Sequence, residues 1–118
     1  MKACATRRPF VWGALASVLG YTMTAVAFYP GFMSADSLTQ YESSKTLKFT
    51  DWHPPVMGWI WSLFNTLSDG PQGMLLWQLG LLWMALFLWY SSLLPTSRGA
   101  WALLAVGLLP WVLNFAGV

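Results

Sequence analysis

The residues that could do chemistry gather in one segment of this sequence, between Tyr29 and Pro55. The 118-residue chain has six basic residues, four acidic residues and one histidine, and six of these eleven side chains lie in that segment. They are Asp36, Glu42, Lys45, Lys48, Asp51 and His53. A carboxylate at neutral pH can accept a proton from an acceptor hydroxyl or bind a divalent cation, and an imidazole can donate a hydrogen bond to a phosphate. The segment is therefore the candidate site.

Asp36 is the strongest candidate for a general base. Ser34 is a good N-cap, which predicts a short helix over residues 35–44 with Asp36 in its first turn. An aspartate there is also stabilised by the positive end of the helix dipole. From spacing alone, this helix-stabilising role is the simpler interpretation, and catalysis is the alternative.

Gln40 lies one helical turn after Asp36, so the two residues share a face of the predicted helix. Leu38 and Tyr41 lie on another side, where they could rest against a membrane surface. We take Gln40 and Tyr41 as candidate substrate-binding residues because they belong to the same short helix as the candidate base.

Asp51 and His53 are the other candidate substrate-binding residues. In one interpretation they form a polar turn in which Trp52 anchors at the level of lipid headgroups and His53 is solvated or bonded to backbone. In the other, Asp51 or His53 contacts a phosphate or orders the loop around Asp36. One histidine and two aspartates fall short of a metal-ligand pattern, so the sequence predicts no defined metal site.

The composition indicates the setting in which this segment works. Hydrophobic residues make up 57% of the chain and charged residues only 8%, whereas soluble domains carry about a quarter charged residues. The three longest stretches without formal charge are residues 9–35, 70–97 and 99–118. Uncharged apolar runs of roughly 18 or more residues are candidates for transmembrane helices. The chain is therefore predicted to be an integral membrane protein, and its net charge of +2 is no indication of a nucleic-acid partner.

The first predicted span covers residues 10–29, and Lys2, Arg7 and Arg8 precede it. Basic residues before a span favour a cytoplasmic amino terminus. A cleaved signal peptide is the alternative, because Ala25-Val26-Ala27 matches a small-residue cleavage site. The apolar core is long for a signal peptide, which favours a membrane span.

The remaining topology depends on one short helix and one arginine. The helix predicted over residues 55–67 would be only about 20 Å long, which is short for a membrane crossing. If Arg98 is cytoplasmic, the span over residues 72–94 runs inward and residues 30–71 stay outside. The predicted fold is all-α and polytopic, with three transmembrane helices (10–29, 72–94 and 99–118) and two short external juxtamembrane helices.

This order of elements resembles the amino-terminal part of the GT-C class of membrane glycosyltransferases, which includes protein mannosyltransferases and aminoarabinose transferases. The matching parts are "SADSLTQY" (Ser34–Tyr41), "DWHPP" (Asp51–Pro55) and the helix over residues 55–67. The resemblance implies that a sugar passes from a polyprenyl-phosphate donor to an acceptor on the external face. It also implies that Asp36 acts as the catalytic base or contacts a metal ion.

The resemblance leads to further expectations. Many members of the class have two consecutive acidic residues where this chain has Asp36 and Ser37, so a divalent cation is implied only as a possible cofactor. Members also have many more spans. We therefore expect residues 1–118 to form a single membrane-embedded unit at the front of a longer enzyme, inactive alone. Its expected partners are membrane lipids, the lipid-linked sugar and further membrane helices, in a bacterial inner membrane. The alternative is a small non-enzymatic membrane subunit or scaffold.

Overall fold

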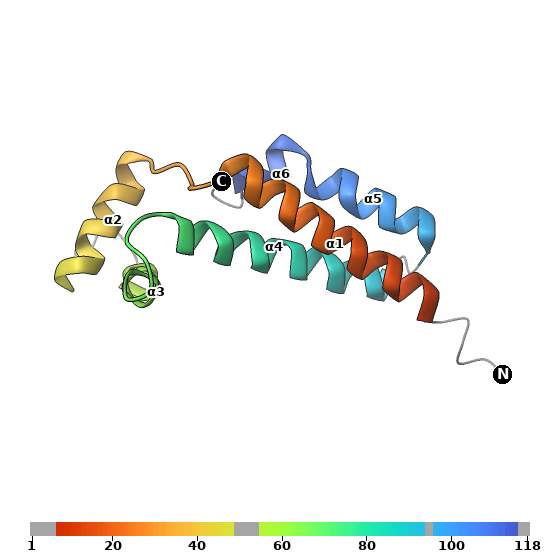
Figure 1. Cartoon of the computed structure of the whole chain (residues 1–118), viewed down its shortest axis with the longest axis horizontal. Helices are drawn as coiled ribbons and strands as arrows, with labels where there is room; N and C mark the ends of the chain where they lie inside the picture. The colour runs from red at the N-terminus through yellow and green to blue at the C-terminus, as the bar shows by residue number, and fades with distance from the viewer. Residues whose placement is uncertain (1–6, 49–54, 94–95, 116–118) are drawn as a thin grey trace. The chain divides into compact units, whose positions relative to one another are not determined.

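The computed structural model describes residues 7–48, 55–93 and 96–115, and all regular structure within them is helical. Figure 1 shows the helices in chain order. They are α1 (Arg7–Phe28), α2 (Ala35–Thr46), α3 (Pro55–Asn65), α4 (Gln72–Leu93), α5 (Ser97–Gly107) and α6 (Pro110–Phe115). The all-α prediction is confirmed for these residues. The expected helices over 10–29, 35–44, 55–67 and 72–94 correspond to α1, α2, α3 and α4.

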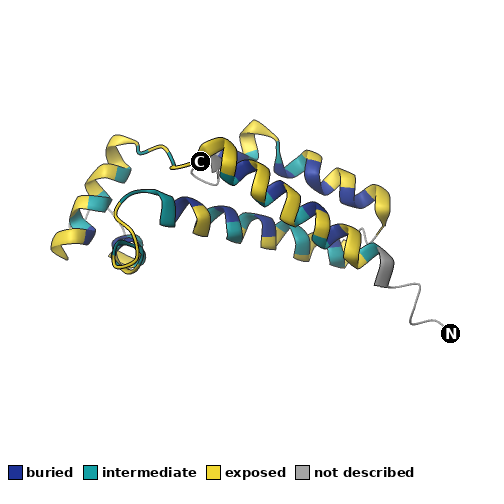
Figure 2. Ribbon diagram, in the orientation of Figure 1, coloured by how far each residue is buried: buried dark blue, intermediate teal, exposed yellow. Residues whose placement is uncertain are grey.

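Two helices, α1 and α4, are long and apolar enough to cross a membrane. The candidate spans are Pro9–Phe28, with 20 residues, and Gln72–Leu93, with 22 residues, and both have a mean hydropathy of 1.5. Only 22% and 28% of their most apolar windows are buried, and Figure 2 shows the exposed positions along both helices. The core helix of a soluble domain would be buried on most of its surface. These helices therefore need lipid or other apolar partners to cover them.

The third expected span, over residues 99–118, is not one continuous helix. The Leu108 N–H donates to the Leu104 carbonyl oxygen over 3.0 Å, and the Leu109 N–H donates to Val106 over 3.2 Å. The next residue is Pro110, which has no N–H to donate and disfavours helical geometry at Leu109. The chain turns there, and α6 begins at Pro110. The prediction of three spanning helices is not confirmed.

The chain divides into two compact units, each described by itself. Unit 1 contains residues 1–27 and 78–118, and unit 2 contains residues 28–77.

The core of unit 1 is built around Trp83 of α4. Its indole Nε1 donates a hydrogen bond to the buried Thr24 Oγ1 over 3.1 Å, and that hydroxyl donates to the Gly20 carbonyl oxygen over 2.8 Å. Glycines let the ring approach, because a Cβ on Gly20 or Gly107 would lie 2.1 or 2.5 Å from a ring carbon. The large ring therefore packs directly against the backbones of α1 and α5.

Tyr90 joins the beginnings of two helices in unit 1. Its hydroxyl oxygen lies 2.7 Å from the Pro9 carbonyl oxygen and 3.0 Å from the Thr96 carbonyl oxygen, so its proton can be donated to either. Its ring packs against Gly13 of α1. The start of α1 and the start of α5 therefore lie at the same end of unit 1, as Figure 1 also shows.

Unit 2 contains the pair α2 and α3, followed by the first turns of α4. The Trp61 ring is buried between the two short helices, and Met74 and Leu75 are buried in α4. The turn before α4 contains Gly70, whose φ of 120° is rarely adopted by residues with a side chain. A glycine there allows the chain to turn sharply from α3 into α4.

Candidate functional site

The predicted cap of α2 is present in the structure. Ser34 has extended backbone angles (φ −72°, ψ 169°), and its Oγ accepts a hydrogen bond from the Ser37 N–H over 3.2 Å. The capped turn holds Asp36 at its second helical position, with its side chain exposed to solvent. No side chain in the described part of unit 2 forms an ion pair or a hydrogen bond with the Asp36 carboxylate. Within the described residues, the Asp36 carboxylate therefore faces solvent and lies near the positive end of the α2 dipole.

Gln40 and Tyr41 lie on different sides of α2. Gln40 is half-buried and follows Asp36 by one turn, so the predicted shared face is present. The Tyr41 ring instead packs edge-on against Trp61 of α3, with 5.3 Å between ring centroids and 67° between planes. Tyr41 therefore contributes to the packing of α2 against α3, and its contact with a membrane surface alongside Leu38 stays a prediction.

Lys45 forms contacts that the sequence did not predict. Its Nζ lies 3.4 Å from Asp69 Oδ1 and 4.5 Å from the centroid of the Tyr41 ring. The Tyr41 side chain, and after it the carboxylate of Asp69, raises the pKa of Lys45 above its ordinary value. Both ends of the ion pair are well exposed, at 47% and 81%, so the pair contributes little to stability. It connects α2 to the turn before α4.

A second unpredicted contact joins the ends of α2 and α3. The Asn65 amide Nδ2 donates to Ser44 Oγ over 2.8 Å, and Ser44 Oγ donates to the Tyr41 carbonyl oxygen over 2.6 Å. The buried Asn65 Oδ1 has no partner among the residues that the structure describes. A polar residue at the end of the apolar sequence "PVMGWIWSLFN" was the only signal for this contact.

The α3 helix has two different faces, which Figure 2 distinguishes by burial. Gly58 and Trp61 are buried, and Trp61 packs against Tyr41 of α2. Val56 and Leu63 are 65% and 63% exposed. Ile60 lies between them at helical spacing, and the three residues line a shallow apolar groove.

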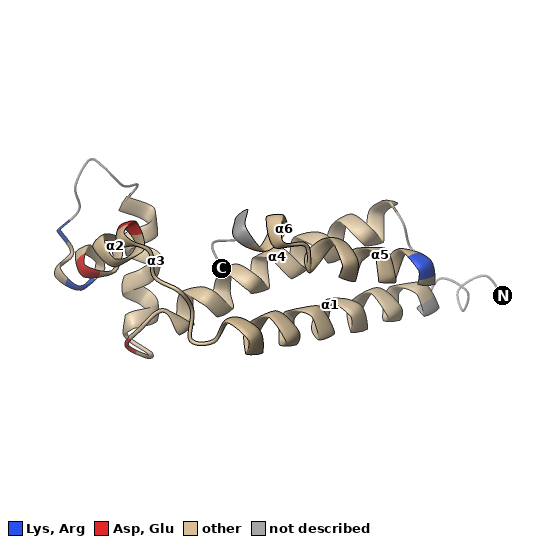
Figure 3. Ribbon diagram, turned by 90° about the horizontal axis from the view of Figure 1, so that it is seen from above, with Lys and Arg blue, Asp and Glu red and all other residues tan. Residues whose placement is uncertain are grey.

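Charge is concentrated on the other helix of the pair, as Figure 3 shows for α2. The α3 sequence contains no charged residue, whereas α2 contains Asp36, Glu42 and Lys45. Unit 2 thus combines one polar helix with one helix that presents an apolar face. This arrangement suits the boundary between water and lipid.

Part of the candidate site lies outside the described residues, namely Asp51 and His53. Whether they approach Asp36 stays a prediction. Within the described ranges, no group of three or more metal-ligating side chains occurs. A search of family models, of curated proteins and of solved structures found no match to this chain.

Proposed function

We propose that this chain is the amino-terminal membrane part of a glycosyltransferase, which moves a sugar from a polyprenyl-phosphate donor to an acceptor on the external face. Asp36 is the proposed base, which takes the proton of the acceptor hydroxyl as the sugar is transferred. Gln40 is the proposed neighbour on the same helix face. His53 is the proposed hydrogen-bond donor to the donor phosphate, and Asp51 is proposed to order the loop around Asp36.

One observation carries the proposal, namely the setting of Asp36. It is a solvent-exposed carboxylate on a capped helix, and the partner helix of that pair has an apolar outer face. A base that serves a lipid-linked donor and a water-borne acceptor has to lie near the membrane–water boundary. The apolar face of α3 would hold the pair at that boundary, since exposed apolar surface on an interfacial helix binds the headgroup region.

The order of the helices supports the proposed side of the membrane. If α1 and α4 both cross the bilayer, the segment between them emerges on the side opposite to Arg7, Arg8 and Arg98. Basic residues near the ends of spans favour the cytoplasm, so this segment and Asp36 would be external.

The test is the exchange Asp36→Asn in the intact protein, assayed for sugar transfer from a polyprenyl-phosphate donor. Removal of a general base lowers the rate roughly 10²- to 10⁴-fold, and the exchange should leave membrane insertion unchanged. Glu42→Gln is the matched control, because Glu42 is another exposed acid on the same helix. Activity retained by Asp36→Asn would remove the residue from the mechanism.

A membrane scaffold or subunit is the second candidate function. The observation in its favour is the large exposed apolar surface, which includes Val18, Val26, Met84 and Trp111 at exposures between 61% and 77%. Such surface is also what partner helices would cover. If the intact protein has no transferase activity and co-purifies in a fixed ratio with another membrane protein, this second function is favoured.

A further inference from the structure

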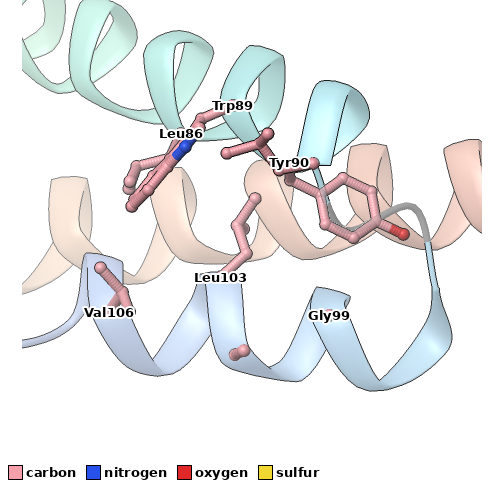
Figure 4. A pocket seen from close by; sticks show the side chains of 8 residues that line it. Leu86, Trp89, Tyr90, Gly99, Leu103 and Val106 are labelled. Atoms are coloured by element: carbon pink, nitrogen blue, oxygen red, sulfur yellow. The ribbon is translucent and has the colours of Figure 1, made fainter.

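Two apolar grooves run along α5 in unit 1, and they differ in size. The groove between α4 and α5, shown in Figure 4 with Leu86, Trp89 and Tyr90, has a volume of about 110 Å³. The groove between α1 and α5 has a volume of about 230 Å³. An apolar cavity of roughly 150 Å³ is enough to bind benzene. The α1–α5 groove is therefore large enough for a segment of hydrocarbon chain.

The walls of the α1–α5 groove suit such a chain. The small side chains of Ala16 and Ala100 are buried in its floor, and Trp12 and Trp101 are exposed beside it. In water this groove would expose apolar surface. In a bilayer an acyl chain can fill it and regain the dispersion contacts that an empty groove lacks.

An exposed arginine, Arg98, lies at one end of unit 1. Ser97 lines the α1–α5 groove, and the exposed Arg98 follows it directly. Tyr90 brings the start of α5 next to the start of α1. The residues of unit 1 include no aspartate or glutamate at all. An anionic group would therefore be attracted to this end of the groove.

We propose that unit 1 binds an anionic phospholipid, with one acyl chain in the α1–α5 groove and the phosphate at the end marked by Arg98. Phosphatidylglycerol is a lipid with the required chemistry. The site is independent of glycosyl transfer and of Asp36, because it requires only that unit 1 lies in a membrane. It also differs from the proposed donor site, which lies in the segment between α1 and α4.

The experiment is native mass spectrometry of the purified chain in a mild detergent. The chain is mixed with equal amounts of phosphatidylglycerol and phosphatidylcholine that have the same acyl chains. We expect preferential retention of phosphatidylglycerol. An exposed basic residue near an anionic lipid contributes about 1 kcal/mol, so Arg98→Gln should reduce that preference roughly fivefold. Arg98→Lys should keep most of it, and Lys48→Gln in unit 2 should keep all of it.

A second pair of variants tests the groove itself. Trp101→Ala removes one wall and should weaken retention of both lipids, whereas Trp111→Ala should not. Trp111 is the matched control because it is 77% exposed, close to the 72% of Trp101, and does not line the groove. Circular dichroism of each variant verifies that its helices are intact.

Three results would overturn the proposal. The first is equal retention of the two phospholipids by the unaltered chain. The second is an unchanged lipid preference in Arg98→Gln. The third is a lipid-free dimer whose contact includes Trp101, because a second copy would then occupy the groove. The exchange Asp36→Asn should leave lipid retention unchanged, so failure here is distinguishable from failure of the proposed transferase function.

Discussion

At the scale of single residues, unit 1 depends on glycines that let aromatic rings approach the backbone. Gly20 and Gly80 both lie inside long helices, yet their surroundings differ. A Cβ on Gly20 would lie 2.1 Å from the Trp83 ring, whereas the nearest atom to a Cβ on Gly80 is 4.0 Å away, in Tyr21. Trp83 is 2% exposed and hydrogen-bonded to Thr24, so the ring has little freedom to move.

This difference predicts that the same exchange, glycine to alanine, affects stability differently at the two positions. Gly20→Ala should destabilise the chain by about 1–3 kcal/mol, because overpacking shifts the buried ring. Gly80→Ala should leave stability unchanged or raise it by up to about 1 kcal/mol, because alanine is the better helix former. Denaturant titration in detergent micelles measures both. Equal effects of the two exchanges would contradict the packing of Trp83 against α1.

At the scale of elements, local sequence signals predicted four of the helices, α1 to α4. The Ser34 cap and the uncharged runs are read directly from neighbouring residues, and α1, α2, α3 and α4 lie close to their expected positions. The division of the third expected span was missed, although Pro110 was the local signal for it. A single proline inside an apolar run can be accommodated in a membrane helix, so composition alone does not predict the turn.

The contacts between elements could not be predicted from the sequence in the same way. Lys45 and Asp69 are 24 positions apart, and Ser44 and Asn65 are 21 positions apart. Neither pair can be recognised before α2 is placed against α3 and the turn that follows it. The position of Asp36 in a first helical turn could be predicted because it depends on a local N-cap, in which Ser34 accepts from Ser37 three residues later. Its relation to Asp51 and His53 stays a prediction.

The two faces of α3 lead to a prediction at this scale. A spin label attached through Leu63→Cys should be accessible to oxygen dissolved in lipid, because that residue lies on the exposed apolar face. A label attached through Thr39→Cys on α2 should be accessible to a water-soluble nickel complex. Electron paramagnetic resonance in reconstituted vesicles, with Cys4 replaced by Ser, measures both accessibilities. If the label at position 63 is as accessible to the nickel complex as the label at position 39, α3 does not rest on the membrane.

At the scale of the whole molecule, every charged side chain of unit 1 is basic, whereas every acidic residue of the chain lies in unit 2. Unit 1 has four basic residues and unit 2 has two, Lys45 and Lys48, and the side with more lysine and arginine near the spans favours the cytoplasm. The proposed transferase function and the proposed external position of Asp36 both depend on this orientation. The lipid site depends only on membrane insertion.

The most direct test of the orientation is cysteine labelling in intact cells, again with Cys4 replaced by Ser. A cysteine introduced at Asp69 should react with a membrane-impermeant maleimide, because the segment between α1 and α4 is proposed to be external. A cysteine introduced at Ser97 should react only after the cells are permeabilised, because the proposed orientation places the start of α5 in the cytoplasm. If position 69 is labelled only after permeabilisation, the segment that carries Asp36 is cytoplasmic and the proposed function is wrong.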